Sequence, residues 1–280
     1  MQSILNLFLF FLVSFTSSAY VCAGGKLIGT SGVSQVEGSA GGGLVPWATL
    51  AGYSTRDEQG AAAFFSAVTV DNFRMVSHGF SYAYHDRIEA SFAHQEFESD
   101  DKAIRLSQDI LGFKVRIFGD LVYSLWPQFA LGLQYKNASN SKLLKSIGSR
   151  DDKGVDYYLA ATKAWLDGPF HRNFVLNTTL RYTKGNQLGL QGFGGDKHDA
   201  YNSLFEASVG LYISRHWVVG VEYRQKPDNL SALKEDDWKD LFIVYVPNKR
   251  LSLTTAFVDL GRLGGLSDQK GAYMSLQLAY

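Results

Sequence analysis

The sequence predicts an antiparallel transmembrane β-barrel of about twelve strands, and three observations support this prediction. Segments of strand length alternate between apolar and polar residues along most of the 280-residue chain. Short connections between these segments alternate with long polar ones, as in barrels with short turns on one side of a membrane and loops on the other. The segment 271–280 also alternates and ends on an aromatic residue, with no further residues to cover its edge. Closure into a barrel would pair that edge.

The composition fits a β-rich chain. The 27 Lys and Arg residues balance 27 Asp and Glu residues, so the chain has no net charge that would attract nucleic acid. After the amino-terminal segment, no run reaches the roughly eighteen apolar residues that a membrane helix needs. A soluble β-sandwich also alternates, but its inward face should carry large apolar residues. Here the polar face of the segments is rich in Gly, Ala and Ser beside isolated charges, which favours the barrel.

Residues 1–23 are expected to form a secretory signal peptide. Residues 4–15 are apolar but short, and small residues follow, with cleavage expected after Ala23 or alternatively after Ala19. Cys22 is the only cysteine and would leave with the signal, so the mature chain would carry no thiol. An exported chain of this size without disulfides indicates the bacterial envelope.

Residues 24–60 form a Gly-rich segment for which three roles remain open. The segment contains the run Gly41-Gly42-Gly43 between other small residues. It could be a periplasmic lead-in, a plug inside the lumen, or an extra hairpin that pairs 33–40 with 46–53. The hairpin would raise the strand count to about fourteen. Periodicity alone does not choose among these roles.

The barrel itself is predicted to occupy residues 61–280. Its strands are placed at 61–70, 74–84, 87–98, 111–120, 128–136, 154–165, 173–184, 202–213, 216–226, 238–246, 250–260 and 271–280. Long connections are expected near 99–110, 137–153, 185–201, 227–237 and 261–270. The strand at 128–136 alternates clearly, because Leu131 and Leu133 lie on one face and Gln134 on the other. The strands at 61–70, 154–165 and 238–246 are apolar on both faces, which leaves their facing open.

The strand at 271–280 is expected to close the barrel. Its outward face contains Ala272, Met274, Leu276, Leu278 and Tyr280. This pattern resembles the closing strand that bacterial outer-membrane barrels present to their assembly machinery, where the last residue is aromatic. Its partner should be the strand at 61–70, or 33–40 if the extra hairpin forms.

Seven polar side chains are predicted to face the lumen. They are Lys114, Arg116, Gln134, Arg181, Glu206, Glu222 and Arg224. Charges of both signs are stable inside a barrel only when they are hydrated or paired. A water-filled lumen would form a narrow passive channel for small polar solutes with little ion selectivity, and this is the function that the sequence favours. If the charges pair, especially if residues 24–60 enter, the barrel is closed and has a structural or binding role.

Neither catalysis nor metal binding is predicted. Outer-membrane lipid hydrolases use a Ser activated by a His two residues before it, and none of the six His residues is followed by such a Ser. Two clusters carry possible ligands for a hard cation, namely His94, Glu96 and Glu98, and Asp196, His198 and Asp199. Solvated charge explains both clusters better, so the sequence predicts no metal ligands and no cofactor.

Three stretches resemble a known family. They are Gly-Val-Ser-Gln-Val-Glu-Gly-Ser-Ala-Gly-Gly-Gly-Leu-Val-Pro-Trp-Ala at 32–48, Gly-Tyr-Ser-Thr-Arg-Asp-Glu at 52–58, and His-Asp-Arg-Ile-Glu at 85–89. Together they resemble an uncharacterised family of Gram-negative envelope proteins, a domain of unknown function presumed to form outer-membrane β-barrels. The resemblance implies an outer-membrane location and no specific site residues. We expect the partners there to be outer-membrane lipid, lipopolysaccharide and the barrel assembly machinery, and not nucleic acid.

Overall fold

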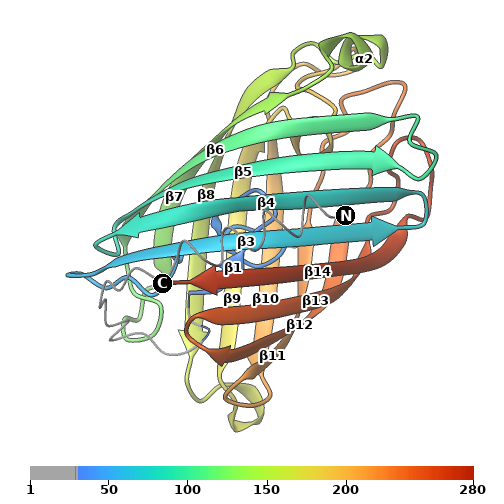
Figure 1. Cartoon of the computed structure of the whole chain (residues 1–280). Helices are drawn as coiled ribbons and strands as arrows, with labels where there is room; N and C mark the ends of the chain where they lie inside the picture. The colour runs from blue at the N-terminus through green and yellow to red at the C-terminus, as the bar shows by residue number, and fades with distance from the viewer. Residues whose placement is uncertain (1–28, 30) are drawn as a thin grey trace, which may run out of the picture.

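Twelve antiparallel strands form one closed barrel in the computed structural model, which describes residue 29 and residues 31–280 (Figure 1). The barrel strands are β3 (Gln59–Val70), β4 (Phe73–Tyr84), β5 (Ile88–Ser99), β6 (Arg105–Phe118), β7 (Gln128–Ala138), β8 (Lys153–Trp165), β9 (Phe174–Thr183), β10 (Asn202–Tyr212), β11 (Trp217–Arg224), β12 (Trp238–Asn248), β13 (Leu251–Asp259) and β14 (Lys270–Ala279). Each pairs with its neighbour in sequence, and β14 returns to β3. The expected fold class is confirmed.

Strand β14 closes the barrel against β3. Leu276 pairs with Phe65 and Met274 with Ala67, and the Tyr280 amide donates a hydrogen bond of 2.7 Å to the Ala61 carbonyl oxygen. Because the partner of β14 is β3, the alternative with about fourteen strands is wrong. Of the outward set predicted for this strand, Ala272, Met274 and Leu278 are exposed, whereas Leu276 and Tyr280 are half-buried.

Large apolar side chains cover the outer wall of the barrel. Phe80, Leu180, Leu241 and Phe257 are each close to 60 % exposed. So much exposed apolar surface is unfavourable in water and is stable against lipid chains. The structure also settles the facing of the strands that were apolar on both faces. In β3, β8 and β12, respectively, Phe64, Tyr158 and Phe242 point inward and are buried.

Strand β6 begins six residues earlier than predicted. It starts at Arg105 rather than 111, so the expected long connection at 99–110 is a turn at 100–104. The reason lies in its outward face, where Arg105 and Asp109 are polar and do not follow the apolar-out pattern. Both are stabilised across the strand pair, since Arg105 lies 3.1 Å from Glu98 and Asp109 lies 2.7 Å from His94.

Leu133 points outward at the middle of β7, so its replacement tests whether this face of the strand contacts lipid. We expect Leu133→Arg to lower the free energy of unfolding in lipid bilayers by about 2–4 kcal/mol, because the guanidinium would lie in the apolar band. Asn137→Arg is the matched control at the outer end of the same strand, where the cost should be about 0–1 kcal/mol. Urea titration of both variants measures the difference. Equal costs would contradict the orientation described here.

The connections differ in length at the two ends of the barrel. At the end that carries Tyr280 they span 85–87, 119–127, 166–173, 213–216 and 249–250. At the other end, called the outer end below, they span 71–72, 100–104, 139–152, 184–201, 225–237 and 260–269. The longer ones include the helix α2 (Ser141–Ser146), in 139–152, and the 3-10 turn η2 (Asn186–Gly189), in 184–201; a further turn, η1 (Pro169–His171), lies at the Tyr280 end. No helix among the described residues is long and apolar enough to cross a membrane.

Residues 31–54 lie inside the barrel and are called the plug here (Figure 1). Every residue from 33 to 54 is buried. The plug contains a two-stranded sheet of β1 (Val33–Ser34) and β2 (Ala40–Gly41), which do not join the wall. The hairpin alternative, with 33–40 paired with 46–53, is therefore wrong, because β1 pairs with β2 after a turn of five residues and the backbone around them bonds to wall side chains. The signal peptide expected over 1–23 lies outside the described residues.

Candidate functional site

A buried network of six charged side chains joins the plug to the wall. Its carboxylates belong to Glu37, Asp156 and Glu206, and its cations to Lys136, Arg181 and Arg224. All six side chains are at most 3 % exposed. Three charges of each sign leave the network neutral, which is the condition under which buried ions are stable.

Glu37 is the contribution of the plug to this network. Its carboxylate accepts a hydrogen bond of 2.8 Å from Arg224, lies 3.3 Å from Arg181 and is paired with Lys136. These cations come from β11, β9 and β7, so one carboxylate ties the plug to three strands. Removing that carboxylate would leave the network with a net positive charge.

A second anchor is the ion pair between Lys114 and Glu89, whose atoms lie 3.2 Å apart. The Glu89 carboxylate accepts hydrogen bonds from the backbone amides of Ala40 and Ala51, at 3.1 and 2.8 Å. The Lys114 ammonium donates to the carbonyl oxygens of Ala40 and Thr49, at 2.9 and 2.8 Å. The irregular plug backbone thus finds in the wall the partners that a sheet would otherwise supply.

Neutral side chains and one further carboxylate satisfy more of the plug backbone. The Leu44 amide donates to Glu222 at 2.7 Å, and the Pro46 carbonyl oxygen accepts from Thr179 at 2.8 Å. Ala48 both donates to Thr162 and accepts from Gln128, each at 2.7 Å. The contacts are spread around the barrel, so the plug is held on several sides.

The run of three glycines in the plug has unequal room for side chains. A Cβ on Gly41 would lie 2.4 Å from the Val45 carbonyl oxygen and 2.9 Å from the Pro46 Cα, whereas one on Gly43 would have no neighbour nearer than 3.4 Å. We expect Gly41→Ala to lower the free energy of unfolding by about 1–3 kcal/mol through overpacking against backbone. Gly43→Ala is the control and should change it by less than about 0.5 kcal/mol. Chemical unfolding compares the two, and equal stability would refute the tight packing of the plug.

Residues of the 184–201 loop fold inward and form a second layer of closure. The Leu188 carbonyl oxygen in η2 accepts hydrogen bonds from Lys136 at 2.9 Å and Gln108 at 3.3 Å. The Gln187 amide donates to Glu235 at 3.0 Å. Glu235 in turn pairs with Lys226 at 3.2 Å, and burial of both lowers the pKa of Lys226 to about 8 and raises that of Glu235. The 184–201 loop is therefore bound to the wall and to the 225–237 loop, and Lys136 contacts both this loop and Glu37 of the plug.

The structure places most of the predicted lumen set together. Lys114, Gln134, Arg181, Glu206, Glu222 and Arg224 are inward and buried. Arg116 lies apart from them. Its half-buried guanidinium pairs with Asp86 and, at 3.4 Å, with Asp120 at the Tyr280 end of the barrel.

Several members of the site are missing from the predicted set. Lys136 and Glu89 share an inward face with other polar residues of their strands, so alternation could have identified both. Asp156 lies in β8, whose facing the sequence left open. Glu37 carries no periodic signal, since it lies in the turn between two strands of two residues each.

The two clusters considered for metal binding lie elsewhere. His94 is on the outer wall, where its ring nitrogens lie 2.7 Å from Asp109 and 3.5 Å from Glu96. In the 184–201 loop, Asp196 accepts a hydrogen bond from the Ser231 amide and Asp199 pairs with Lys184. Within the described part of the chain, no group of three or more His, Cys, Asp or Glu side chains is placed to hold a metal ion.

A family model described as "Protein of unknown function (DUF3034)" matches residues 30–277. The chain belongs to this family. The expected membership of an uncharacterised barrel family is confirmed, and the DUF3034 match covers plug and barrel together. No curated protein matches the chain.

Solved structures similar to this DUF3034 protein include an outer-membrane protein and a porin. Omp33 of Acinetobacter baumannii is 6% identical with a TM-score of 0.48, over 81% of this chain and 100% of that one. The KdgM porin is 9% identical with a TM-score of 0.47, over 78% and 99%. LpxR from Salmonella typhimurium is 9% identical with a TM-score of 0.46, over 79% and 99%.

Proposed function

We propose that this protein is a closed outer-membrane barrel with a binding role, and that it is not a passive diffusion channel. The observation that carries the proposal is the neutral ion network around Glu37, which fixes the plug inside the lumen. A passive channel for polar solutes needs hydrated charges along its axis. Here Lys114, Lys136, Arg181 and Arg224 are paired with carboxylates and buried, which fits the closed alternative.

Location in the outer membrane is part of the proposal. The apolar outer wall, with aromatic residues such as Trp165, Tyr182 and Trp217 near strand ends, fits a lipid bilayer and its two interfaces. The end of the barrel that carries Tyr280 would then face the periplasm. The long loops of the outer end would face the outside of the cell. Lipid and lipopolysaccharide would contact the wall, and the assembly machinery would engage β14.

We also propose that the barrel has no hydrolytic activity. A lipid hydrolase of this fold type would need a Ser beside an activating His. The described His residues make other contacts, for example His94 with Asp109 on the wall and His216 with the Val246 carbonyl oxygen at 2.9 Å. These contacts support a barrel without hydrolytic activity.

Single-channel recording tests the closed state. We expect the refolded protein to give no conductance steps above background in a planar bilayer, because the plug and outer loops occupy the lumen. A shift in gel mobility on heating provides the control that the barrel has folded. Regular steps from folded, unmodified protein would refute the proposal and support the passive channel.

A further inference from the structure

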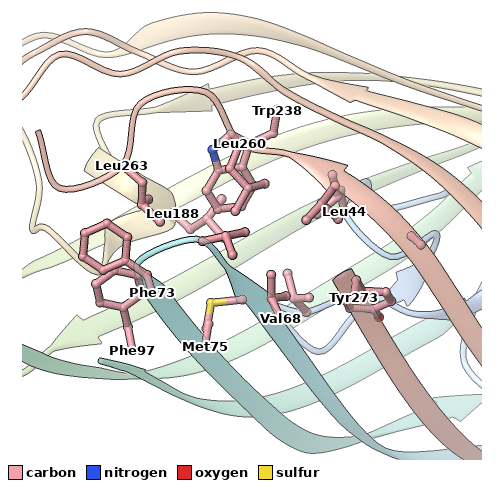
Figure 2. Packing of buried hydrophobic residues seen from close by; sticks show 14 of the residues in the cluster. Leu44, Val68, Phe73, Met75, Phe97, Leu188, Trp238, Leu260, Leu263 and Tyr273 are labelled. Carbon is pink, nitrogen blue, oxygen red and sulfur yellow. The ribbon is translucent and has the colours of Figure 1, made fainter. Parts of the chain in front are cut away.

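The loops at the outer end keep their large apolar side chains away from water. Leu188, Leu260 and Leu263 turn inward and pack in the buried apolar cluster inside the lumen (Figure 2). Among the described residues of these loops, Leu266 is the only large apolar side chain that is exposed. The outer loops therefore present a mainly polar surface.

Two loops at the Tyr280 end display large apolar side chains instead. They are the first loop, 119–127, with Tyr123, Leu125 and Trp126, and the second loop, 166–173, with Phe170; these four side chains are called the apolar rim here. Leu125 is 100 % exposed and Phe170 is 84 % exposed. The φ angle of Phe170 is 59°, in the left-handed region that bulky residues rarely adopt, so the chain bears strain at the point where this ring is displayed. Such exposed apolar surface indicates a partner at this end of the barrel.

Hydrogen bonds and packing hold the backbone of the first loop in place. The Asp120 carboxylate accepts from the amides of Val122 and Tyr123, at 2.9 and 2.8 Å. On the inner side, Leu121 and Val122 pack against the buried cluster that contains Trp47 of the plug. Because the inner side is already occupied, the rim side chains of this loop point away from the lumen.

Lys163 places the first loop over the outward face of β8. Its side chain leaves the strand on the same face as the exposed Leu159 and Trp165, yet it is buried. The ammonium donates to the carbonyl oxygens of Val122, at 3.1 Å, and of Ser124. The loop thus covers this cation on the side that faces lipid.

The apolar wall continues into both loops. Phe118 and Phe129 border the first loop, with their ring centroids 4.6 Å apart, and Trp165 and Phe174 border the second, 5.7 Å apart. Phe118 is 50 % exposed and Trp165 41 %. The rim therefore extends the lipid-facing surface past the ends of the strands.

We propose that the apolar rim inserts into the periplasmic leaflet of the membrane, at the level of the phospholipid headgroups, and anchors this end of the barrel there. Tyr and Trp are stable at that level because each combines an apolar ring with a polar group. The only charged residue of the first loop, Asp120, is paired with Arg116 at 3.4 Å, so insertion leaves no charge of this loop unpaired. The inference rests on the outer-membrane location proposed above.

The test places an environment-sensitive fluorophore on single cysteines of the full chain, folded in phospholipid vesicles and with the change Cys22→Ser. Leu125→Cys reports on the rim. Leu131→Cys, on the outward face of β7, is the control for lipid, and Arg215→Cys, in the turn 213–216 at the same end, is the control for water. We expect phospholipids with brominated acyl chains to quench the probes at 125 and 131. Iodide, present on both sides of the vesicle membrane, should quench only the probe at 215.

Phe170→Cys repeats the measurement on the second loop, and its probe should behave like the one at 125. Exposure of either rim probe to iodide, while the probe at 131 is quenched by lipid, would overturn the inference and leave the rim open to a protein partner. If the folded protein shows no lipid quenching at 131 either, the outer-membrane location fails and the inference fails with it. Gel mobility before and after heating checks that each labelled variant has folded.

Discussion

Replacing Glu37 by Gln should lower the free energy of unfolding by about 3–5 kcal/mol, the cost of breaking a buried ion pair by removing one partner. The substitution keeps the shape of the side chain. It leaves Lys136, Arg181 and Arg224 with only Asp156 and Glu206, so the buried network would carry one uncompensated positive charge. Urea titration followed by tryptophan fluorescence measures the loss.

Two comparisons make this result specific. Asp57→Asn removes an exposed carboxylate a short distance along the same segment and should change stability by less than about 0.5 kcal/mol. The double variant Glu37→Gln with Lys136→Gln restores neutrality, with two charges of each sign. We expect it to be destabilised by less than the sum of the single changes, since residues in one network couple. Additive losses, or a Glu37→Gln protein as stable as the native one, would contradict the role of charge balance.

Opening the pore should require removal of both layers of closure. We expect that deletion of residues 33–53 alone, or replacement of 186–193 by a short Gly-Ser link alone, leaves conductance at background. The reason is that each layer keeps wall contacts of its own besides the shared Lys136: η2 accepts from Gln108, and the plug is bonded to Glu89 and Lys114. The combined variant should conduct in planar bilayers, with little ion selectivity because wall charges of both signs remain.

The control for this experiment is a Gly-Ser replacement of the exposed turn residues 101–103 at the same end, which should not conduct. Every variant is first checked for heat-dependent gel mobility. Full conductance after deletion of the plug alone would show that the loops do not close the outer end, and absence of conductance in the folded combined variant would contradict closure by these two layers.

The barrel was predictable from sequence because lipid imposes a strict rule on each strand. Alternation placed Leu131 and Leu133 outward and Gln134 inward, and pairing of every edge required closure. The apolar-out pattern fails at positions where something other than lipid stabilises the outward side chain. Strand β6 begins at Arg105, where cross-strand ion pairs rather than lipid stabilise the outward face.

The candidate site was only partly predictable. The inward charges of the wall, such as Arg181 and Arg224, followed from alternation. Their counter-ion Glu37 did not, because the plug has almost no regular structure and its position depends on contacts far away in sequence. The buried apolar cluster inside the lumen was hidden for a related reason, because inward Phe242 and Val244 in β12 made both faces of that strand read as apolar.

The closing of β14 on β3 has a consequence for the order of folding. Glu37 and its partner Arg224 are 187 residues apart, and Leu44 and Glu222 are 178 apart. Both bonds join the plug to β11, a strand that is followed by only three more, β12 to β14. We therefore expect the plug to lie among the strands before the seam between Tyr280 and Ala61 forms. Contacts of such long sequence separation make folding slow, so we expect formation of the plug contacts to limit the rate at which the barrel closes.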